Sequence, residues 1–367
     1  MGEAATRLAG GEAPPAARLI RLAFSDLAGW RDDDHGAALA AFRRGAVVLA
    51  DRPPKARPLG ADPAALMEIV RRSRQVPESD AGTFFEASFE PHAVEPTDGA
   101  PFFTGYYEPE VEGSRTETRA FHYPLYRPPE DLVEINPGSV PGVGTDFRFA
   151  RIIGSGYREH YDRAAVNAGA LAGEGLELVW LADAVDAFFI HVQGSARIRL
   201  GNGETVRVTY AAKSGHPYTS IGRIMIERGA LTREAATMED IRQWLASHRA
   251  MAASVMNANR SFIYFREVTG LDPTLGPLGA AKVQLSAGRS LAVDRALHAF
   301  HTPVWVETAL PSGGAIRSLM IAQDTGSAIV GPARGDIFFG SGEEAGAIAG
   351  AMRAGGRFVV LLPRGAS

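Results

Sequence analysis

The sequence predicts a mainly β protein with flanking helices, in which a β domain is inserted into a first domain made from both ends of the chain. Three observations predict this class. The first hundred residues have mostly helical patterns, the stretch from about 108 to 213 is rich in strand and turn signals, and the end of the chain is strand-rich again. We therefore expect a discontinuous domain of residues 1–107 and 214–367 and an inserted β domain of residues 108–213. A groove between the two is the default ligand site.

Composition supports two compact units and excludes several classes of function. The chain has 367 residues, 46% hydrophobic and 22% charged, which is typical of a globular protein. The formal net charge of −4 argues against a nucleic-acid partner, because phosphate binding favours a basic excess. The absence of cysteine excludes disulfides, thiolate zinc sites and cysteine nucleophiles. No apolar run approaches the 18 or so residues of a transmembrane helix.

Helix signals open the chain. Asp62 and Pro63 read as an N-cap and a first helical residue, and an apolar face follows them. The stretch from Trp30 to Arg44 carries a similar helical pattern. Residues 1–7 lack the apolar core of a signal peptide, so we expect that an exported form would be trimmed or would carry its signal elsewhere.

Strand signals dominate the middle. Val179-Trp180 and the run from Phe188 to Val192 look like buried strands. Alternating residues on both sides of Gly201-Asn202-Gly203 predict a β-hairpin between 196 and 210.

Helices return after Tyr218, and the chain then ends in strands. Gly229 is expected to stop one helix, and Thr237 with Asp240 resembles a capping box at the start of the next. From about 283 to 363 the sequence predicts a compact β unit, interrupted by a short helix between Glu343 and Arg353.

Three aspartates in this last unit carry the strongest chemical signal. Asp324 follows a buried strand at a glycine turn, Asp336 enters another apolar strand, and Asp294 ends a third. Burial and like-charged neighbours both raise a carboxyl pKa, and a carboxyl that stays protonated near neutral pH can act as a general acid. Strand-end aspartates more often cap turns, however, and spacing alone does not decide between these roles.

Other catalytic classes fit less well. Asp324-Thr325-Gly326 suggests an aspartic protease, but such an enzyme needs two carboxylates and the chain has a single Asp-Thr-Gly element. No Gly-x-Ser-x-Gly elbow occurs. His298 and His301 lack an acidic partner at helical spacing, so we expect packed or surface histidines and no metal site. The tyrosines at 106, 107, 123 and 126 either pack a domain seam or offer stacking surface to a sugar chain.

Several blocks in order resemble the membrane-bound lytic murein transglycosylase A family. The resemblance runs from about 102 to 363 and rests on Thr104-Gly105-Tyr106-Tyr107-Glu108-Pro109, Tyr123-Pro124-Leu125-Tyr126, Val192-Gln193-Gly194-Ser195, residues 213–222, and Gln323-Asp324-Thr325-Gly326 through Asp336. It implies a double-psi β-barrel that holds the three aspartates, the 3D unit at about 283–363, facing an inserted β domain across a groove for glycan strands.

The resemblance also implies the activity and its setting. The family cleaves the β-1,4 bond between N-acetylmuramic acid and N-acetylglucosamine and leaves 1,6-anhydromuramyl ends, without a cofactor. The expected protein is thus a lyase on peptidoglycan, monomeric and periplasmic, with outer-membrane association in its native form. Without cysteine, the chain as given cannot carry a lipid anchor. The alternative is a protein that binds glycan without cleaving it.

When the roles of the family's residues are assigned to the matching positions of this chain, the resemblance implies that Asp336 is the catalytic acid and that Asp324 lies beside it. Asp294 matches the first aspartate of the 3D unit; it is grouped with the substrate-binding residues, although we expect it to be more structural. The other residues expected along the groove are Thr104, Gly105, Tyr106, Gln193, Ser195 and Lys213. One departure follows Asp294, where the chain reads His298-Ala299-Phe300-His301-Thr302-Pro303 in place of the family's proline-glycine-threonine turn.

Overall fold

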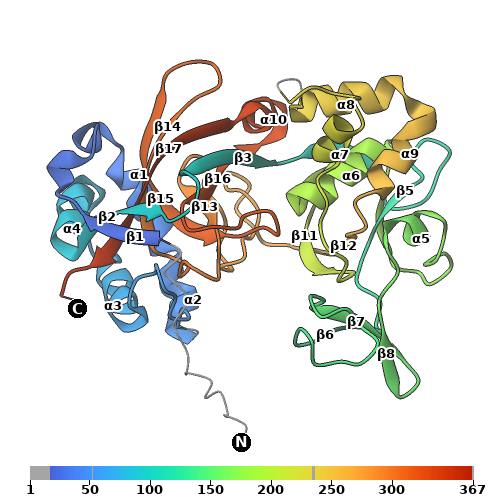
Figure 1. The fold of residues 1–367 in the computed structure, drawn as a ribbon, viewed down its shortest axis with the longest axis horizontal. Helices are drawn as coiled ribbons and strands as arrows, with labels where there is room; N and C mark the ends of the chain where they lie inside the picture. Colours follow the sequence, from blue (N-terminus) through green and yellow to red (C-terminus); the bar gives the residue numbers. More distant parts are fainter. Residues whose placement is uncertain (1–16, 52, 234–235, 366–367) are drawn as a thin grey trace, which may run out of the picture.

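The structure, a computed structural model, describes residues 17–51, 53–233 and 236–365. Residues 1–7, on which the expectation about a signal peptide is based, lie outside the described residues. Two lobes lie side by side (Figure 1). The first lobe comprises residues 17–108 and 268–365 and holds the largest sheet; the second comprises residues 109–267 and holds two smaller sheets.

Within the described residues, the sheet of the first lobe has eight strands. Their order is β1 (Ala17–Arg21), β2 (Phe89–Pro96), β17 (Arg353–Pro363), β14 (Pro303–Ala309), β15 (Ala315–Asp324), β13 (Ser290–Val293), β16 (Arg334–Ser341) and β3 (Phe102–Glu108). A further pairing of β17 with β3 joins β17, β14, β15, β13, β16 and β3 into a closed ring. The strand-rich C-terminal unit is therefore confirmed, and β3 from the N-terminal part is built into it.

Two large apolar clusters pack against this sheet. Phe103, Leu291, Val304, Ile337 and Phe358 are buried together within one core. The other face of the sheet is covered by α1 (His35–Arg43), α2 (Gly45–Asp51), α3 (Pro63–Ser73) and α4 (Ala81–Ser88), whose apolar residues pack on Trp305 and its neighbours. Burial of these side chains, at roughly 25 cal/mol per Å² of apolar surface, is the main source of stability for the lobe.

The second lobe contains the predicted hairpin. A sheet of six strands runs in the order β12 (Ile263–Glu267), β11 (Thr205–Lys213), β10 (Ser195–Leu200), β4 (Glu110–Ser114), β9 (Glu177–Leu181) and β5 (Tyr123–Tyr126). A sheet of three strands consists of β6 (Leu132–Glu134), β7 (Phe149–Ile153) and β8 (Gly156–Arg158). The antiparallel β10 and β11 flank Gly203, whose φ of 85° suits the tight turn.

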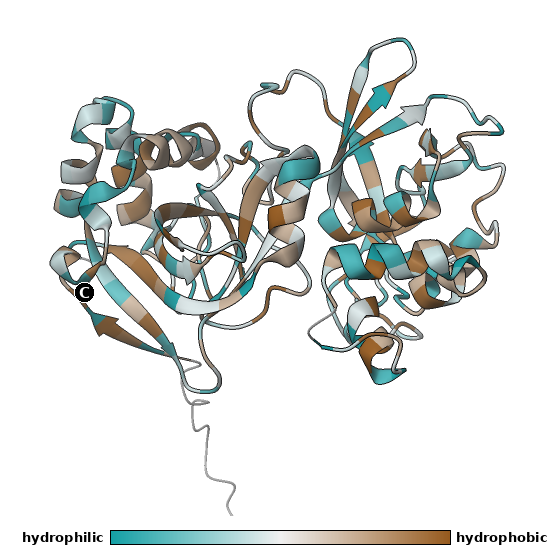
Figure 2. Cartoon of the chain, turned by 90° about the horizontal axis from the view of Figure 1, so that it is seen from above, coloured by the Kyte–Doolittle hydropathy of each residue, from teal (hydrophilic) through white to brown (hydrophobic). Residues whose placement is uncertain are grey.

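The helices of the second lobe are α5 (Arg163–Asn167), α6 (Ala184–Gln193), α7 (Ile221–Glu227), α8 (Met238–Ser247) and α9 (Arg249–Asn257). Phe188 and Phe189 of α6 pack against apolar residues of α7, α8 and α9. These helices mix hydrophobic and hydrophilic residues along their surfaces (Figure 2). Residues 214–267, expected to return to the first domain, thus pack on the second lobe, and β12 adds a strand to its sheet.

The expected strand at 188–192 is wrong, because these residues lie in α6. A short apolar run has no periodicity that separates strand from helix, and the flanking caps decide the outcome. Asp183 caps the helix start by accepting from the Val185 N–H at 2.7 Å, and Gly194 ends it with a φ of 81°. The mostly helical reading of the first hundred residues also missed β1 and β2, which pair with each other at the edge of the sheet.

Helix boundaries predicted from capping residues are confirmed. The Asp62 side chain accepts from the Ala65 N–H at 2.8 Å at the start of α3. Thr237 and Asp240 form the reciprocal capping box of α8. Gly229 follows α7 with a φ of 70°, and α10 (Gly342–Ala351) is the predicted late helix. Across the described ranges, none of the helices has the length and apolar character needed to cross a membrane.

Candidate active site

The two aspartates expected to be catalytic lie on either side of one central strand. In β13, Ala292 pairs with Asp336 of the antiparallel β16 and with Asp324 of the parallel β15. On the far side of β16, Asp336 pairs with Thr104 of β3. Residues separated by up to 232 positions are thereby brought into one site by strand order.

The Asp336 side chain is partly exposed, and its environment shifts its pKa upward. The pKa of its carboxyl is raised from 3.8 to about 6. Burial is the largest cause and the nearby charge of Asp324 adds to the rise, while the Arg334 charge and the hydrogen bond from Thr104 oppose it. The Thr104 hydroxyl donates to Oδ1 of Asp336 and accepts from the Arg334 guanidinium at 2.6 Å. A carboxyl in this state can give up a proton and take it back.

Asp324 is held by three donors. Its Oδ1 accepts from the backbone N–H groups of Ala280 and Thr325, each at 2.9 Å, and its Oδ2 accepts from the Tyr106 hydroxyl at 3.0 Å. Burial raises the pKa of Asp324, and these three hydrogen bonds oppose the rise by favouring the charged form. Tyr106 is itself buried, and its own pKa is raised well above the usual value.

Asp294 serves the backbone of the neighbouring loops. Its two carboxylate oxygens accept from the Ala296 N–H and the Gly331 N–H, each at 2.9 Å. These bonds fasten the loop after β13 to the loop between β15 and β16. The geometry is that of a residue that caps a turn.

Gly105 contributes backbone and no side-chain contact. A Cβ there would lie 2.6 Å from the Phe339 ring and 2.8 Å from the Ala349 Cα, so the glycine allows α10 to approach β3 closely.

Three expected residues come from the second lobe. Gln193 at the end of α6 accepts from the Tyr107 N–H at 3.1 Å, which ties it to β3. Lys213 at the end of β11 reaches across to Ser327, with its Nζ 3.4 Å from the hydroxyl oxygen. Ser195 is buried at the start of β10, paired with Thr209. The structure thus brings Gln193 and Lys213 toward the first lobe, while Ser195 lies inside the second.

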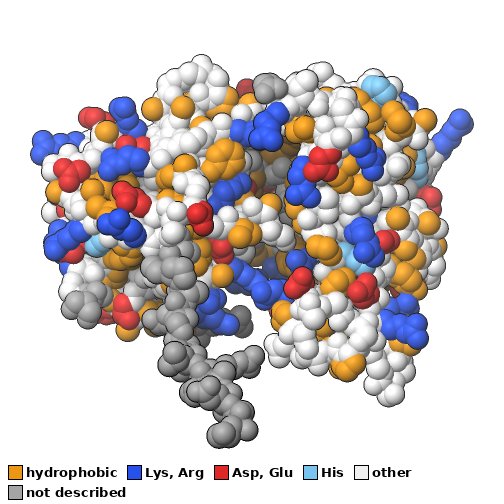
Figure 3. Space-filling model, viewed as in Figure 1, with side chains coloured by type: hydrophobic (Ala, Val, Ile, Leu, Met, Phe, Trp, Pro, Cys, Tyr) orange, Lys and Arg blue, Asp and Glu red, His pale blue; other side chains and the backbone are white. Residues whose placement is uncertain are grey.

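The surface between the lobes is hollowed, and Lys and Arg side chains gather around the hollow (Figure 3). Lys213 belongs to a cationic group, because Arg148 and Arg295 lie close enough to add to the lowering of its pKa by burial. Arg148 and Arg295 are exposed, and none of the three makes an ion pair with a described residue. Such a surface favours anionic groups on a ligand.

Two residues at the site were not singled out from the sequence. Arg334 stands two positions before Asp336 on the same strand, and this period of two places both side chains on one face. The pattern Arg-x-Asp could have found it. Tyr218 lies close enough to Asp336 for the aspartate to contribute to its raised pKa, after burial, which is the larger cause. It was part of the 213–222 block, but nothing in its spacing pointed to Asp336.

The histidines at 298 and 301 are buried, and the His298 Nε2 lies 2.7 Å from the Pro332 carbonyl oxygen. Among the residues described, no group of three or more His, Asp or Glu side chains is arranged to hold a metal ion.

Comparison with known proteins decides the family. Residues 102–266 match the MltA specific insert domain and residues 289–362 match the 3D domain. The crystal structure of the membrane-bound lytic murein transglycosylase from Agrobacterium tumefaciens is 40% identical, with a TM-score of 0.87, over 94% of this chain and 98% of that one. The chain belongs to the membrane-bound lytic murein transglycosylase A family.

Two further relatives share less of their sequence with this chain. Membrane-bound lytic murein transglycosylase A of Escherichia coli K12 is 33% identical over 268 residues, which is 71% of this chain. The match spans 65% of the length of that curated relative. A crystal structure of the E. coli protein with bound chitohexaose is 26% identical, with a TM-score of 0.67, over 95% of this chain and 92% of that chain.

Proposed function

We propose that the protein is a lytic transglycosylase that cleaves the β-1,4 bond between N-acetylmuramic acid and N-acetylglucosamine in peptidoglycan. The observation that carries this proposal is the position of Asp336, which lies across Ala292 from Asp324 and close to Tyr218 of the second lobe, and whose pKa burial raises to about 6. Family membership supports the reaction class, since the relatives are named for it. A glycan as ligand is supported by the chitohexaose complex of the E. coli relative.

In the proposed reaction, Asp336 acts first as acid and then as base. Its proton goes to the glycosidic oxygen as the bond to C1 of the muramyl residue breaks, and positive charge develops at C1. The C6 hydroxyl of the same sugar then attacks C1 and passes its proton to the Asp336 carboxylate. The carboxyl is thereby restored, and the product carries a 1,6-anhydro ring without adding water.

A single carboxylate suffices because the nucleophile belongs to the substrate. Hydrolytic glycosidases use a second carboxylate to supply a nucleophile or activate water, whereas here proximity within one sugar replaces it. General acid catalysis is typically worth about 10²–10⁴-fold. Asp324 keeps negative charge near Asp336, which favours the protonated acid, and Thr104 and Arg334 orient and stabilise the carboxylate formed after proton transfer.

Further parts of the proposal concern architecture and setting. The closed ring of strands in the first lobe is proposed to be the double-psi β-barrel of the family, and the two lobes its two domains. The second lobe would supply Gln193, Lys213 and neighbouring groups to the far wall of the groove, with peptide-bearing glycan strands as ligands. We further propose that the protein works as a monomer in the periplasm at the outer membrane, without a cofactor.

The test is digestion of purified peptidoglycan, followed by mass spectrometry of the soluble fragments. The protein should release anhydromuropeptides about 18 Da lighter than the products of hydrolysis. Asp336→Asn should release none while still sedimenting with the cell wall. Full turnover by Asp336→Asn would overturn the assignment of the acid. Binding of the unmodified protein without any anhydro product would favour a glycan-binding protein instead.

A further inference from the structure

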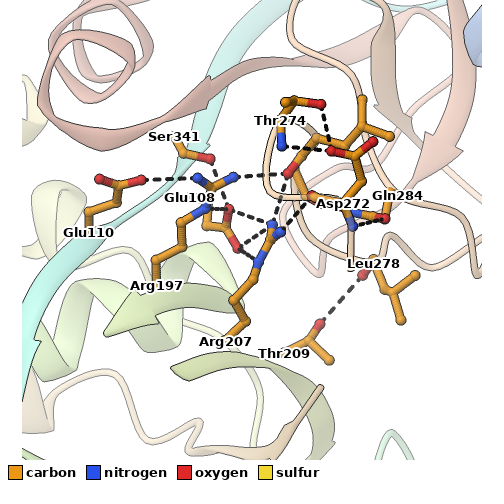
Figure 4. A network of polar contacts seen from close by, with 12 residues as sticks. Glu108, Glu110, Arg197, Arg207, Thr209, Asp272, Thr274, Leu278, Gln284 and Ser341 are labelled. Atoms are coloured by element: carbon orange, nitrogen blue, oxygen red, sulfur yellow. Dashed lines mark hydrogen bonds and ion pairs between the residues drawn. The ribbon is translucent and has the colours of Figure 1, made fainter. Parts of the chain in front are cut away.

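Glu108 is a fully buried carboxylate at the junction of the lobes (Figure 4). It ends β3, the last strand before the chain enters the second lobe through Pro109. Its oxygens accept from the Arg197 Nε at 2.7 Å, from an Arg207 terminal nitrogen at 2.9 Å and from the Ser341 hydroxyl at 2.8 Å. None of the steps in the proposed reaction uses this group.

The donors come from both lobes. Arg197 and Arg207 stand opposite each other on β10 and β11, so two neighbouring strands of the second lobe aim their guanidinium groups at one carboxylate. Ser341 ends β16 in the first lobe and pairs with Glu108. The Glu108 carboxylate therefore links two parts of the molecule. It accepts a hydrogen bond from Ser341 on the strand that carries Asp336, and it forms ion pairs with two arginines on the sheet that carries Lys213.

The same two arginines also fasten the return of the chain to the first lobe. Terminal nitrogens of Arg197 and Arg207 donate to the Leu275 carbonyl oxygen at 2.9 and 3.0 Å, and Arg207 also donates to the Asp272 carbonyl oxygen at 3.1 Å. Leu275 and Asp272 belong to the connection between β12 and β13. The segment that leads into the second lobe and the segment that returns from it therefore meet at one cluster. We call this cluster the crossover clamp; it consists of Glu108, Arg197, Arg207, Ser341 and the carbonyl of Leu275.

The apolar cores of the lobes do not include the residues of the crossover clamp. Apolar residues of the first lobe gather in clusters around Trp305 and Phe103, and those of the second gather around Ile198 and Met225. Another contact between the lobes is made where Met238 of α8 packs near Tyr107, Ala345 and Ala349. A change in the clamp should therefore alter the angle between the lobes before it unfolds either of them.

We propose that Glu108 is a positioning residue that sets the angle between the lobes, and with it the width of the hollow. Two guanidinium groups on a rigid hairpin can satisfy one buried carboxylate in a narrow range of geometries, because the bonds are charge-assisted and directional. A buried charge that loses a partner is strongly destabilised, which penalises other lobe angles. The consequence for catalysis rests on the proposed function: Asp336 on one wall and Lys213 on the other must meet the same glycan strand.

The experiment measures the angle directly. Because the chain has no cysteine, spin labels can be placed at Ala309→Cys on β14 and Ala172→Cys in the second lobe, both of which are exposed. Pulsed electron paramagnetic resonance then reports the distance distribution between the lobes. Glu108→Gln, which keeps the shape and removes the charge, should broaden the distribution. Glu267→Gln is the matched control, since it removes a carboxylate whose ion pair with Arg115 lies within the second lobe.

Kinetics provide the second readout. Glu108→Gln should raise KM for long glycan strands about tenfold with a smaller change in kcat, and should leave the pH of half-maximal activity in place. Ser341→Ala, which removes one donor without exposing a charge, should act in the same direction more weakly and serves if Glu108→Gln does not fold. An unchanged distance distribution in the folded variant would overturn the proposal. The distance measurement needs no turnover, so absence of anhydro product would contradict the proposed function and leave the clamp standing.

Discussion

Thr104 donates its hydroxyl hydrogen to the Asp336 carboxylate, from the strand that lies beside it in the sheet. The same oxygen accepts from Arg334, so one hydroxyl links the Asp336 carboxylate to the Arg334 guanidinium. This hydrogen bond favours the charged form of Asp336 and limits the rise in its pKa caused by burial. The acid strength of the site is therefore set partly by a residue far away in the sequence.

Replacing Thr104 by valine should raise the pKa of Asp336, because the charged form loses a hydrogen bond. We expect activity to persist about one pH unit further into the alkaline range. The measurement is kcat/KM against pH, with Thr104→Ser as the control that retains the hydroxyl. A valine variant with an unmoved alkaline limb would show that this bond does not tune the acid.

Replacing Tyr106 by phenylalanine should have the opposite effect to Thr104→Val: the pH at which activity falls on the alkaline side should be lower. Loss of the Tyr106 hydroxyl removes a donor from Asp324, raises the pKa of Asp324 and reduces its negative charge near Asp336. The pKa of Asp336 should then fall, by about half a pH unit. The same pH profile checks this, and a shift in the same direction as Thr104→Val would contradict the coupling of the two aspartates.

The free energy of unfolding should depend on pH through the titration of Asp336. Its pKa in the folded protein is raised from 3.8 to about 6, so its contribution to stability is fully present below about pH 4 and is lost as the pH rises through 6. Asp336→Asn does not titrate there. The difference in free energy of unfolding between Asp336→Asn and the unmodified protein should therefore shift in favour of the variant by on the order of 2 kcal/mol from pH 4 to pH 8.

Urea unfolding at the two pH values measures this difference. Asp146→Asn, an exposed carboxyl in the loop before β7, is the control and should show a much smaller change. If Asp336→Asn changed the free energy of unfolding by the same amount at pH 4 and pH 8, the raised pKa of Asp336 would be ruled out.

Lys213→Gln should weaken binding of peptide-bearing glycan, because it removes charge from the cationic group that Lys213 forms with Arg148 and Arg295. We expect the Kd, measured in the Asp336→Asn background, to rise about tenfold at low salt and less at high salt, where surface charges are screened. Arg21→Gln on the edge strand β1, which pairs with Glu90, is the control. A loss of affinity that does not depend on salt would mean that Lys213 acts through packing.

Local chemistry in the sequence was enough for much of the fold. The capping residues Asp62 and Thr237 mark helix starts where the structure has them, and the Gly-Asn-Gly turn places its hairpin. These signals depend on hydrogen bonds within a few residues, so they are visible in a single stretch of chain. Where a short apolar run could serve either structure, as at 188–192, the same reasoning gave a strand in place of α6.

The sequence by itself determined that three aspartates sit at the ends of apolar strands and that the chain resembles a family of peptidoglycan lyases. Only the tertiary structure decided that Asp324 and Asp336 flank one residue of β13, that Thr104 and Arg334 meet at Asp336, and that Glu108 joins the lobes. These contacts depend on the order of strands in the sheet and on how the lobes meet. They link residues far apart in the chain, so no local sequence pattern predicts them. The pKa of a carboxyl depends on the groups that these long-range contacts place around it.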